Sequence, residues 1–404
     1  MRTPAEVLSE ILSRVRPLEG RESVDLGAAP GRVLAADVAS DLDLPPFNKS
    51  AVDGYAVRAG DFGEACAPSG ERVLRVLGES RAGAPWEGSV EPGTCVAIYT
   101  GAELPRGADA VIMVEASVPV ESGVRLRDRP AAGAHICPRG QDVQRGQRVL
   151  CAGRRLRPTD LALLASVGCE PVSVFVRPRV AVLTTGDELV PPGAPPGPGE
   201  IRESNTQSLA ALCTRAGGLV QNLGVVRDDP SVLREALAQA LGRCDALVTT
   251  GGVSMGRYDL VGSALESLGV TPVLHKVAIK PGKPLWFGMF GAVPVFALPG
   301  NPVSCVVNHA AFVGPALARM GGESPGEARP PRGRWLGAAL APNPREQYLP
   351  VRVEHGEDGV ASLLPVRWNG SADVVGIAQA EAFAIVPIGL PLAARGLVEY
   401  RPLP

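Results

Sequence analysis

The sequence has few aromatic residues and a net charge close to zero, and it lacks long apolar runs. A formal net charge of −2 gives no electrostatic basis for binding nucleic acid or a membrane surface. Aromatic residues make up 4% of the chain, which argues against platforms on which bases stack. No stretch reaches the roughly 18 apolar residues that a transmembrane helix needs. We therefore expect a soluble globular protein with neither nucleic acid nor membrane as a partner.

Metal-binding cysteine patterns are also absent. None of the eight cysteines is spaced as Cys-x-x-Cys, and no histidine pair lies nearby at zinc spacing. In a chain this long they are interpreted as small buried hydrophobic residues in a reducing compartment. The first residues carry acids where a signal peptide would have its apolar stretch. Both features predict a cytoplasmic protein.

Lysine is scarce, and its placement is informative. The chain has 36 arginines but only four lysines, which are Lys49, Lys276, Lys280 and Lys283. The last three lysines fall within eight residues. Lysine is a compact point charge, whereas arginine is a wide planar fork. The cluster therefore suggests a tight anion site, although a solvated basic turn is the alternative.

The length of 404 residues predicts two to four domains. Strand and helix patterns alternate through residues 177–326, which predicts an α/β domain whose sheet is mostly parallel. Asp229 and Asn301 are expected to cap two of its helices, and Gly217 to stop a third. The expected strands are 180–185, 223–226, 246–250 and 293–298, and the expected helices are 206–216, 230–241, 259–268 and 302–320.

The rest of the chain divides around this domain. Helices are expected at 5–16 and 158–167, and a β-like stretch at 31–38. We predict four domains in a multidomain α/β and β protein. They are a small helical and strand base domain (1–46 plus 144–176), a β-rich inserted domain (47–143), the α/β domain (177–326) and a C-terminal β-barrel-like domain (327–404).

Four polar loops follow the apolar strands of the α/β domain, where such sheets bind ligands. They are Thr184–Glu188, Arg227–Asp229, Thr249–Gly256 and Pro299–Pro302. The glycines of the third loop let backbone approach an anion. Asp228 and Asp259 are expected at neighbouring strand ends, where two carboxylates would suit Mg²⁺. A turn role for Asp228 and a capping role for Asp259 are the alternatives.

Lys276 and Lys280 bracket a short apolar run, so we expect one strand that carries both on one face. Their separation would be about 13 Å at roughly 3.3 Å per residue. Lys283 follows a Pro-Gly turn. Nothing in the spacing ties Asp53, Thr100 or Asp142 of the β-rich domain to the α/β domain.

Seven motifs together resemble one family, the MoeA family of molybdopterin molybdenumtransferases, which includes the gephyrin E domain. They are Ser50–Ala56, Thr100–Val111, Thr185–Leu189, Ser204–Asn205, Gly251–Ser254, Ala278–Pro284 and Leu298–Ser304. The resemblance runs from about residue 5 to 320.

This resemblance implies that molybdenum from molybdate is inserted into adenylylated molybdopterin, with Mg²⁺-assisted release of AMP. It implies a homodimer in which the β-rich domain of one subunit faces the α/β domain of the other. Further expected partners are molybdopterin adenylyltransferase and the apoproteins of molybdoenzymes. Two other functions stay open: molybdopterin adenylyl transfer, and a non-catalytic scaffold like gephyrin.

The resemblance also assigns the site residues. The catalytic set that it implies is Asp53, Thr100, Asp142, Glu188, Asp228, Asp259, Lys276 and Lys280, with Asp228 and Asp259 on the metal. The expected substrate or anion contacts are Gly251, Gly252, Ser254, Lys283, Pro299, Asn301 and Ser371. Asn48, Lys49, Val52 and Gln141 depart from the family pattern.

Overall fold

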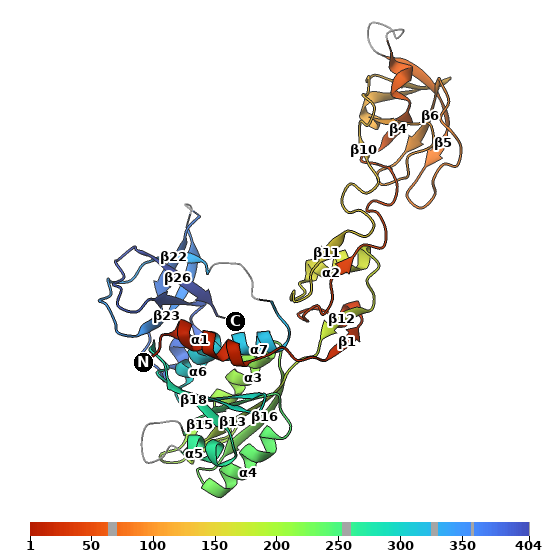
Figure 1. Ribbon diagram of the computed structural model, residues 1–404. Coiled ribbons are helices and arrows are strands. Elements are labelled where there is room, and N and C mark those ends of the chain that lie inside the picture. Colours follow the sequence, from red (N-terminus) through yellow and green to blue (C-terminus); the bar gives the residue numbers. More distant parts are fainter. Residues whose placement is uncertain (64–70, 253–259, 325–329, 357–358, 404) are drawn as a thin grey trace. The chain divides into compact units, whose positions relative to one another are not determined.

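The computed structural model describes residues 1–63, 71–252, 260–324, 330–356 and 359–403 (Figure 1). The chain forms two compact units. One comprises Met1–Ala35, Ala152–Arg157 and Ser173–Pro404, and the other comprises Ala36–Cys151 and Pro158–Val172. The predicted division into four domains stays a prediction. No helix in the described ranges is long and apolar enough to span a membrane.

The first unit is built on a six-stranded central sheet. Its strand order is β16-β13-β17-β21-β20-β18, in which the first four strands are parallel and the last two are antiparallel to their neighbours. The sheet is therefore mixed. The bounds are β13 (Arg179–Thr185), β16 (Leu219–Val226), β17 (Ala246–Thr250), β18 (Thr271–Lys276), β20 (Pro284–Phe290) and β21 (Val293–Leu298).

The antiparallel edge was not expected from the sequence. β20 ends at Phe290 and β21 begins at Val293, so two residues join them, and Gly291 has a φ of 57°. A connection this short can form only a hairpin, since a parallel crossover needs a dozen or more residues. The turn thus sets the direction of β20.

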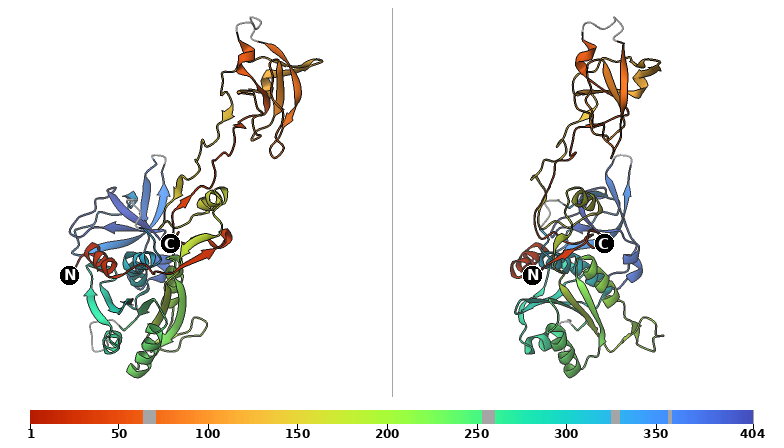
Figure 2. Two further views of the ribbon diagram at one scale, coloured as in Figure 1. Left: turned by 45° about the vertical axis from the view of Figure 1, so that its right-hand side comes forward. Right: turned by 90° about the vertical axis from the view of Figure 1, so that its right-hand side faces the viewer.

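Helices cover both faces of the sheet, as Figure 1 shows. Val180 and Val182 of β13 pack on the side of α3, α6 and α7, whereas Ala181 and Leu183 pack on the side of α4 and α5. This alternation follows from the period of two in a strand. Figure 2 shows the same layers from two further directions. The bounds are α3 (Asn205–Arg215), α4 (Pro230–Leu241), α5 (Leu260–Ser267), α6 (Pro302–Asn308) and α7 (Gly314–Met320).

The expected helix 302–320 is interrupted by a π-helical turn, His309–Val313, between α6 and α7. Asn301 occupies the N-cap position but makes no side-chain hydrogen bond to the helix. Its Nδ2 donates to Ser371 Oγ at 2.9 Å instead. Asn301 is therefore the N-cap residue that the sequence predicts, but its side chain does not cap the helix. Asp229 does cap α4 by accepting from the Ser231 and Val232 amides.

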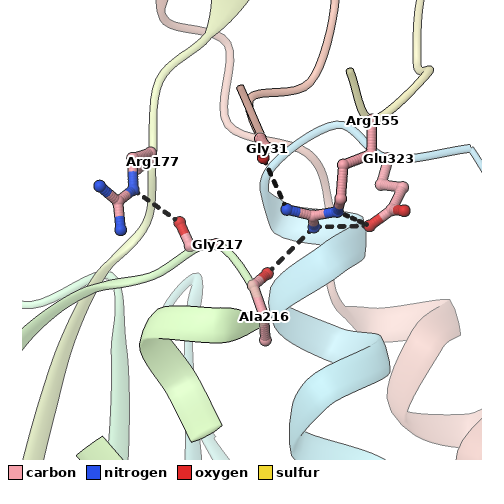
Figure 3. Close-up of polar contacts among 6 residues, drawn as sticks. All are labelled: Gly31, Arg155, Arg177, Ala216, Gly217 and Glu323. Atoms are coloured by element: carbon pink, nitrogen blue, oxygen red, sulfur yellow. Dashed lines mark hydrogen bonds and ion pairs between the residues drawn. The ribbon is translucent and has the colours of Figure 1, made fainter. Parts of the chain in front are cut away.

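Two arginines hold the C-terminal end of α3 (Figure 3). Arg155 Nη2 donates to Ala216 O at 3.2 Å, and Arg177 donates to the carbonyls of Gly217 and Gly218 at 3.1 and 2.6 Å. Arg155 also contacts Glu323 and Gly31 O. Cations at this end offset the negative pole of the helix, and their hydrogen bonds satisfy the carbonyls of the C-cap residue and of the turn that follows it. α3 ends at Arg215, before Gly217, as the sequence predicted.

The C-terminal region forms a closed barrel. β23 pairs with both β24 and β25, and the order β23-β24-β22-β26-β25 returns to β23, so five strands close the ring. Short β19 adds to β23 in parallel. The bounds are β19 (Ile279–Lys280), β22 (Arg332–Trp335), β23 (Glu346–His355), β24 (Ala361–Pro365), β25 (Ala382–Val386), β26 (Leu397–Pro402) and α8 (Val374–Ala378).

The second unit contains another six-stranded sheet, of order β7-β4-β6-β5-β9-β8, and two short ribbons, β10-β3 and β11-β2. Its core is apolar and includes Phe62, Leu74 and Ile112. The bounds are β2 (Val38–Ala39), β3 (Lys49–Ser50), β4 (Gly54–Val57), β5 (Arg72–Ser80), β6 (Thr94–Ile98), β7 (Ala110–Met113), β8 (Ser117–Val120), β9 (Gly123–Leu126), β10 (Ile136–Cys137), β11 (Arg148–Leu150) and α2 (Pro158–Ser166).

The first unit also contains one more helix and two short strand pairs. Helix α1 (Pro4–Arg14) begins with a capping box between Thr3 and Glu6, and strand β1 (Arg21–Val24) pairs with β12 (Val172–Phe175). β14 (Leu189–Val190) pairs with β15 (Ile201–Arg202). The β-like stretch predicted at 31–38 forms only isolated bridges at Val33 and Leu34, followed by β2.

Candidate active site at the carboxyl edge of the central sheet

A cavity of about 390 Å³ lies where the parallel strands of the central sheet end. Residues that follow β13, β16, β17 and β21 contribute to its wall, as expected for an open α/β sheet. Six of the predicted site residues meet there: Glu188, Asp228, Gly251, Gly252, Pro299 and Asn301. The other described residues of the wall are Thr184, Thr185, Gly186, Leu189, Ile201, Asn205, Pro284 and Gly300.

Asp228 is held in place from two directions. The buried Thr185 hydroxyl donates to its Oδ1, and its backbone N–H donates to Asp187 Oδ1 at 3.2 Å. The strand order places β13 between β16 and β17, so Asp228 and Asp259 follow strands that are not neighbours, contrary to our expectation. Asp259 itself, like Ser254, lies outside the described residues.

The donor set around Asp228 consists of hard oxygen atoms. Within the described ranges, no group of three or more His, Cys, Asp or Glu residues could hold a metal ion alone. Mg²⁺ often binds through one or two carboxylates and completes its shell with water and substrate phosphates. A carboxylate anchored by a threonine beside an open cavity fits that mode of binding.

Gly251 and Gly252 cannot be replaced without strain. Their φ angles are 88° and 64°, in the region that favours glycine. A Cβ on Gly251 would lie 2.3 Å from Thr185 O, and one on Gly252 would lie 2.6 Å from Val261 Cγ2. The sheet and α5 therefore pack directly against this turn, and bare backbone forms this part of the cavity wall.

The cavity also has a polar floor that the sequence analysis did not identify. Asn205 Nδ2 donates to Gly300 O at 2.7 Å and to Thr250 Oγ1 at 3.2 Å, and Thr250 Oγ1 donates to Pro299 O at 2.8 Å. Asn205 belongs to Ser204–Asn205, one of the motifs that resemble the family. This motif is the feature of the sequence that could have identified Asn205 as a site residue. Burial raises the pKa of the adjacent Cys305 thiol to about 12, so this cysteine stays protonated.

The lysine cluster differs from the prediction. Lys276 ends β18 in the central sheet, whereas Lys280 belongs to β19, which joins the barrel. Between them the Ile279 amide donates to Val277 O at 2.9 Å, a tight turn that a continuous strand cannot contain. The expectation of one strand with both lysines on one face is therefore wrong. None of the three lysines is among the described wall residues, although Pro284, next to Lys283, is.

Ser371 joins the C-terminal region to the cavity. Asn301 lines the cavity and donates to Ser371 Oγ, and the Val303 amide donates to Ser371 O at 3.0 Å. The structure thus places Ser371 beside a wall residue.

In the second unit, Asp53 and Thr100 form a pair. Asp53 Oδ1 accepts the hydroxyl and the backbone N–H of Thr100, both at 2.7 Å. The Thr100 hydroxyl, and then its amide, hold the pKa of Asp53 below its ordinary value. Asp142 is exposed, and its amide donates to Leu44 O at 2.8 Å. In the same unit, Asn48 Oδ1 accepts the Arg139 amide at 2.9 Å, which gives this departing residue a structural role.

Comparison with known families decides the identity. Residues 2–168 match the model described as MoeA N-terminal region (domain I and II), and residues 335–400 match the MoeA C-terminal region (domain IV). Residues 181–319, which carry the cavity, match the probable molybdopterin binding domain. The chain belongs to the MoeA family.

Similar proteins agree with this assignment. The molybdopterin molybdenumtransferase of Nostoc is 34% identical over 96% of this chain and 90% of its own length. Molybdopterin molybdenumtransferase 2 of Mycobacterium tuberculosis is 37% identical over 91% of this chain and 92% of its own length. A crystal structure of the molybdopterin biosynthesis MoeA protein from Pyrococcus horikoshii superimposes with a TM-score of 0.84 at 30% identity, covering 99% of both chains. The predicted multidomain α/β and β fold is thereby confirmed as that of MoeA.

Proposed function

We propose that this chain inserts molybdenum from molybdate into adenylylated molybdopterin and releases AMP with the help of Mg²⁺. Membership in the MoeA family identifies it as a molybdopterin molybdenumtransferase of molybdenum cofactor biosynthesis. The identity of the substrate as the adenylylated form, the metal and the residue roles are the parts that we add.

The observation that supports this proposal best is the cavity wall around Asp228. A bare glycine turn, a strand-end threonine and an anchored carboxylate meet in one space of about 390 Å³. Backbone that no side chain covers suits close approach of a phosphate group. A single fixed carboxylate among such groups suits a cation that bridges to that phosphate.

Asp228 would hold Mg²⁺, with Asp259 as the second candidate ligand. When bound, the ion neutralises negative charge that develops on the phosphate during cleavage. The chain's own residues keep the site in shape: Thr185 orients Asp228, and Asn205 and Thr250 fix the turn at Pro299 and Gly300. Glu188 stands at the same wall.

Further groups belong to the proposal. Lys276, Lys280 and Lys283 would contribute positive charge for the oxyanions of the substrates, and Ser371 a hydroxyl beside Asn301. The hydrogen bonds from Thr100 favour the ionised form of Asp53 and lower its pKa, which suits a carboxylate that acts in its charged form. Thr100 and Asp142 complete the proposed set. We also propose a cytoplasmic homodimer that works beside molybdopterin adenylyltransferase and molybdoenzyme apoproteins.

The direct test is to incubate the protein with adenylylated molybdopterin, Mg²⁺ and molybdate, and to measure AMP and finished cofactor. We expect both products, in equal amounts and only when Mg²⁺ is present. Formation of adenylate from plain molybdopterin and ATP would favour the adenylyltransferase alternative instead. A protein that leaves adenylylated molybdopterin intact would favour the scaffold alternative. Light scattering tests the homodimer separately.

A further inference from the structure

Helix α6 contains a buried polar side chain that the proposed site does not explain. Asn308, its last residue, is 0% exposed, and its neighbours Val303, Val307 and Phe312 belong to the apolar core. Asparagine is rare in such surroundings, because burial of an amide is costly unless its polar groups are hydrogen-bonded. We therefore expect Asn308 to make a specific contact.

The hydrogen bonds of Asn308 identify this contact. Its Nδ2 donates to Ser304 O at 2.9 Å and to Gly282 O at 3.1 Å. The first bond is local to the helix, so only the second reaches another segment. Its Oδ1 is buried and has no hydrogen-bond partner in the described part of the chain. An apolar side chain at this position would avoid the cost of burying an unpaired oxygen. The hydrogen bond to Gly282 is therefore what asparagine provides here and an apolar residue would not.

Gly282 lies in the middle of the lysine cluster. Pro281 and Gly282 are buried, whereas Lys280 and Lys283 on either side are exposed. Gly282 has a φ of 102°, and a Cβ there would lie 2.5 Å from Asn308 Nδ2. The loop therefore packs closely against Asn308. Lys280 and Lys283 flank this buried contact and are themselves exposed.

The anchored loop leads directly to the cavity. Lys283 O accepts the Val277 amide at 3.1 Å, which closes the turn, and the next residue, Pro284, lines the cavity wall. At the other end of α6, Asn301 lines the same cavity. Helix α6 thus follows a cavity-wall residue at its start and carries the anchor of the lysine loop at its end.

We propose that Asn308 is a positioning residue that holds Lys280 and Lys283 at the cavity rim for a phosphate-type oxyanion of the substrate. This inference rests on the anion-binding role proposed above for the two lysines. Asn308 acts through the backbone of Gly282 and does not itself touch the substrate.

A double-mutant cycle tests the inference, with inorganic pyrophosphate as the probe and calorimetric titration of the full chain at fixed ionic strength. Asn308→Ala is expected to weaken pyrophosphate binding about tenfold, the size of coupling typical of groups that act through one contact. In a Lys280→Ala/Lys283→Ala background the same change is expected to have no further effect. An equal loss in both backgrounds, or no loss in either, would overturn the inference.

Val307→Ala is the matched control, since Val307 is fully buried one residue away and its side chain has no polar group to bond the loop. It is expected to lower stability but to keep pyrophosphate affinity. Asn308→Thr serves if the alanine variant does not fold, because a threonine hydroxyl can bond the carbonyl of Ser304 but not that of Gly282.

The outcome also separates this inference from the function on which it rests. If Lys280→Ala/Lys283→Ala binds pyrophosphate as the natural chain does, the proposed role of the lysines fails and the inference fails with it. If that variant loses affinity while Asn308→Ala keeps it, only the inference fails. Faster hydrogen exchange of the Val277 amide in Asn308→Ala would support the anchoring itself, and unchanged exchange would overturn it.

Discussion

Asp228 and Asp53 are both carboxylates that accept a hydrogen bond from a threonine, but the two pairs lie in different kinds of surroundings. Thr185, the partner of Asp228, is 3% exposed at the end of β13, which lies between β16 and β17 in the central sheet. Thr100, the partner of Asp53, is exposed, as is Asp53 itself. The first carboxylate is bonded to a buried framework without being part of it, whereas the second depends on one local contact.

This difference separates two ways of holding a carboxylate in place. Beside Asp228 the hydrogen bonds continue into the floor of the cavity through Thr184, Thr250 and Pro299. Around Asp53 they end at Thr100, and the pKa of the carboxyl is low because of those bonds alone. Changes to the framework of the first region should therefore damage structure and turnover together, whereas changes in the second should alter mainly protonation.

The largest effect is expected from Asp228→Ala, which tests whether the buried framework serves chemistry. Loss of one electrostatic contact of this kind costs roughly 3 kcal/mol, or about 10²-fold in rate. We expect AMP release to fall by that factor, with little change in the melting temperature, because the substitution removes the carboxylate and leaves the framework around it in place. AMP formation under single turnover is the measurement.

Asp229→Ala provides the matched control for that prediction. Asp229 accepts the Ser231 and Val232 amides at the start of α4, so its loss should cost stability but not turnover. Near-normal AMP release by Asp228→Ala would remove the assignment of the cavity as the active site.

The next largest effect concerns glycines with positive φ in the two regions. Gly251 and Gly101 have φ angles of 88° and 83°, but a Cβ would clash with Thr185 O at Gly251 and would meet nothing within 4 Å at Gly101. Both alanine variants should lose about 1 kcal/mol to backbone strain. Gly251→Ala should lose about 2 kcal/mol more, because carbonyl and Cβ cannot share that space. Urea unfolding measures both, and equal losses would contradict the contrast.

The sequence predicts the framework better than it predicts the contacts. The strands at 180–185 and 246–250 were found because buried parallel strands are continuous apolar runs. β20 was missed because a proline begins it and Gly288 interrupts its apolar pattern. The turn between Lys276 and Lys280 could not be inferred, because Lys276 pairs with Pro284 in the central sheet whereas Lys280 pairs with the distant Gln347 in the barrel.

The sites show the same limit. Glu188, Asp228 and Gly251 were grouped because strand ends of one parallel sheet share an edge. Asp53 and Thr100 are 47 residues apart, and strand pairing in an antiparallel sheet brings them together, which spacing alone does not encode. Asn308 gave no signal beyond being polar in an apolar helix.

A smaller effect is expected where arginines hold the end of α3. Arg155→Ala removes bonds to Ala216, Gly31 and Glu323, and because the side chain is 28% exposed we expect a loss of about 1 to 2 kcal/mol. Arg155→Lys should recover little, since an ammonium cannot reproduce the fork. Arg14→Ala, which breaks an exposed pair with Glu10, should cost less than about 0.5 kcal/mol. Thermal unfolding compares the three.

The smallest effect is expected from Thr100→Val, and it tests the Asp53 half of the contrast. The Thr100 hydroxyl is the largest cause of the low pKa of Asp53, so its removal should raise that pKa toward the ordinary value of 3.8. The Thr100 amide still donates, so the rise should be incomplete. Carboxyl NMR titration of Asp53 measures it. Ser40→Ala is the control, because it removes a hydroxyl of the same unit that donates to Leu42 O, and the pKa of Asp53 should stay unchanged.

The sign of the resulting pH dependence follows from linkage. A carboxyl whose folded pKa lies below its unfolded value contributes stability that is present above the unfolded pKa and is lost as pH falls through the folded pKa. Thr100→Val should therefore lose activity at a higher pH on the acidic side and match the activity of the natural chain near neutral pH. Its stability should be lower than that of the natural chain near neutral pH, and the two stabilities should converge as pH falls below the folded pKa. If the acidic side of the pH–activity profile is the same in Thr100→Val and in the natural chain, Asp53, like Asp228, is held by more than its threonine. The contrast between the two regions would then disappear.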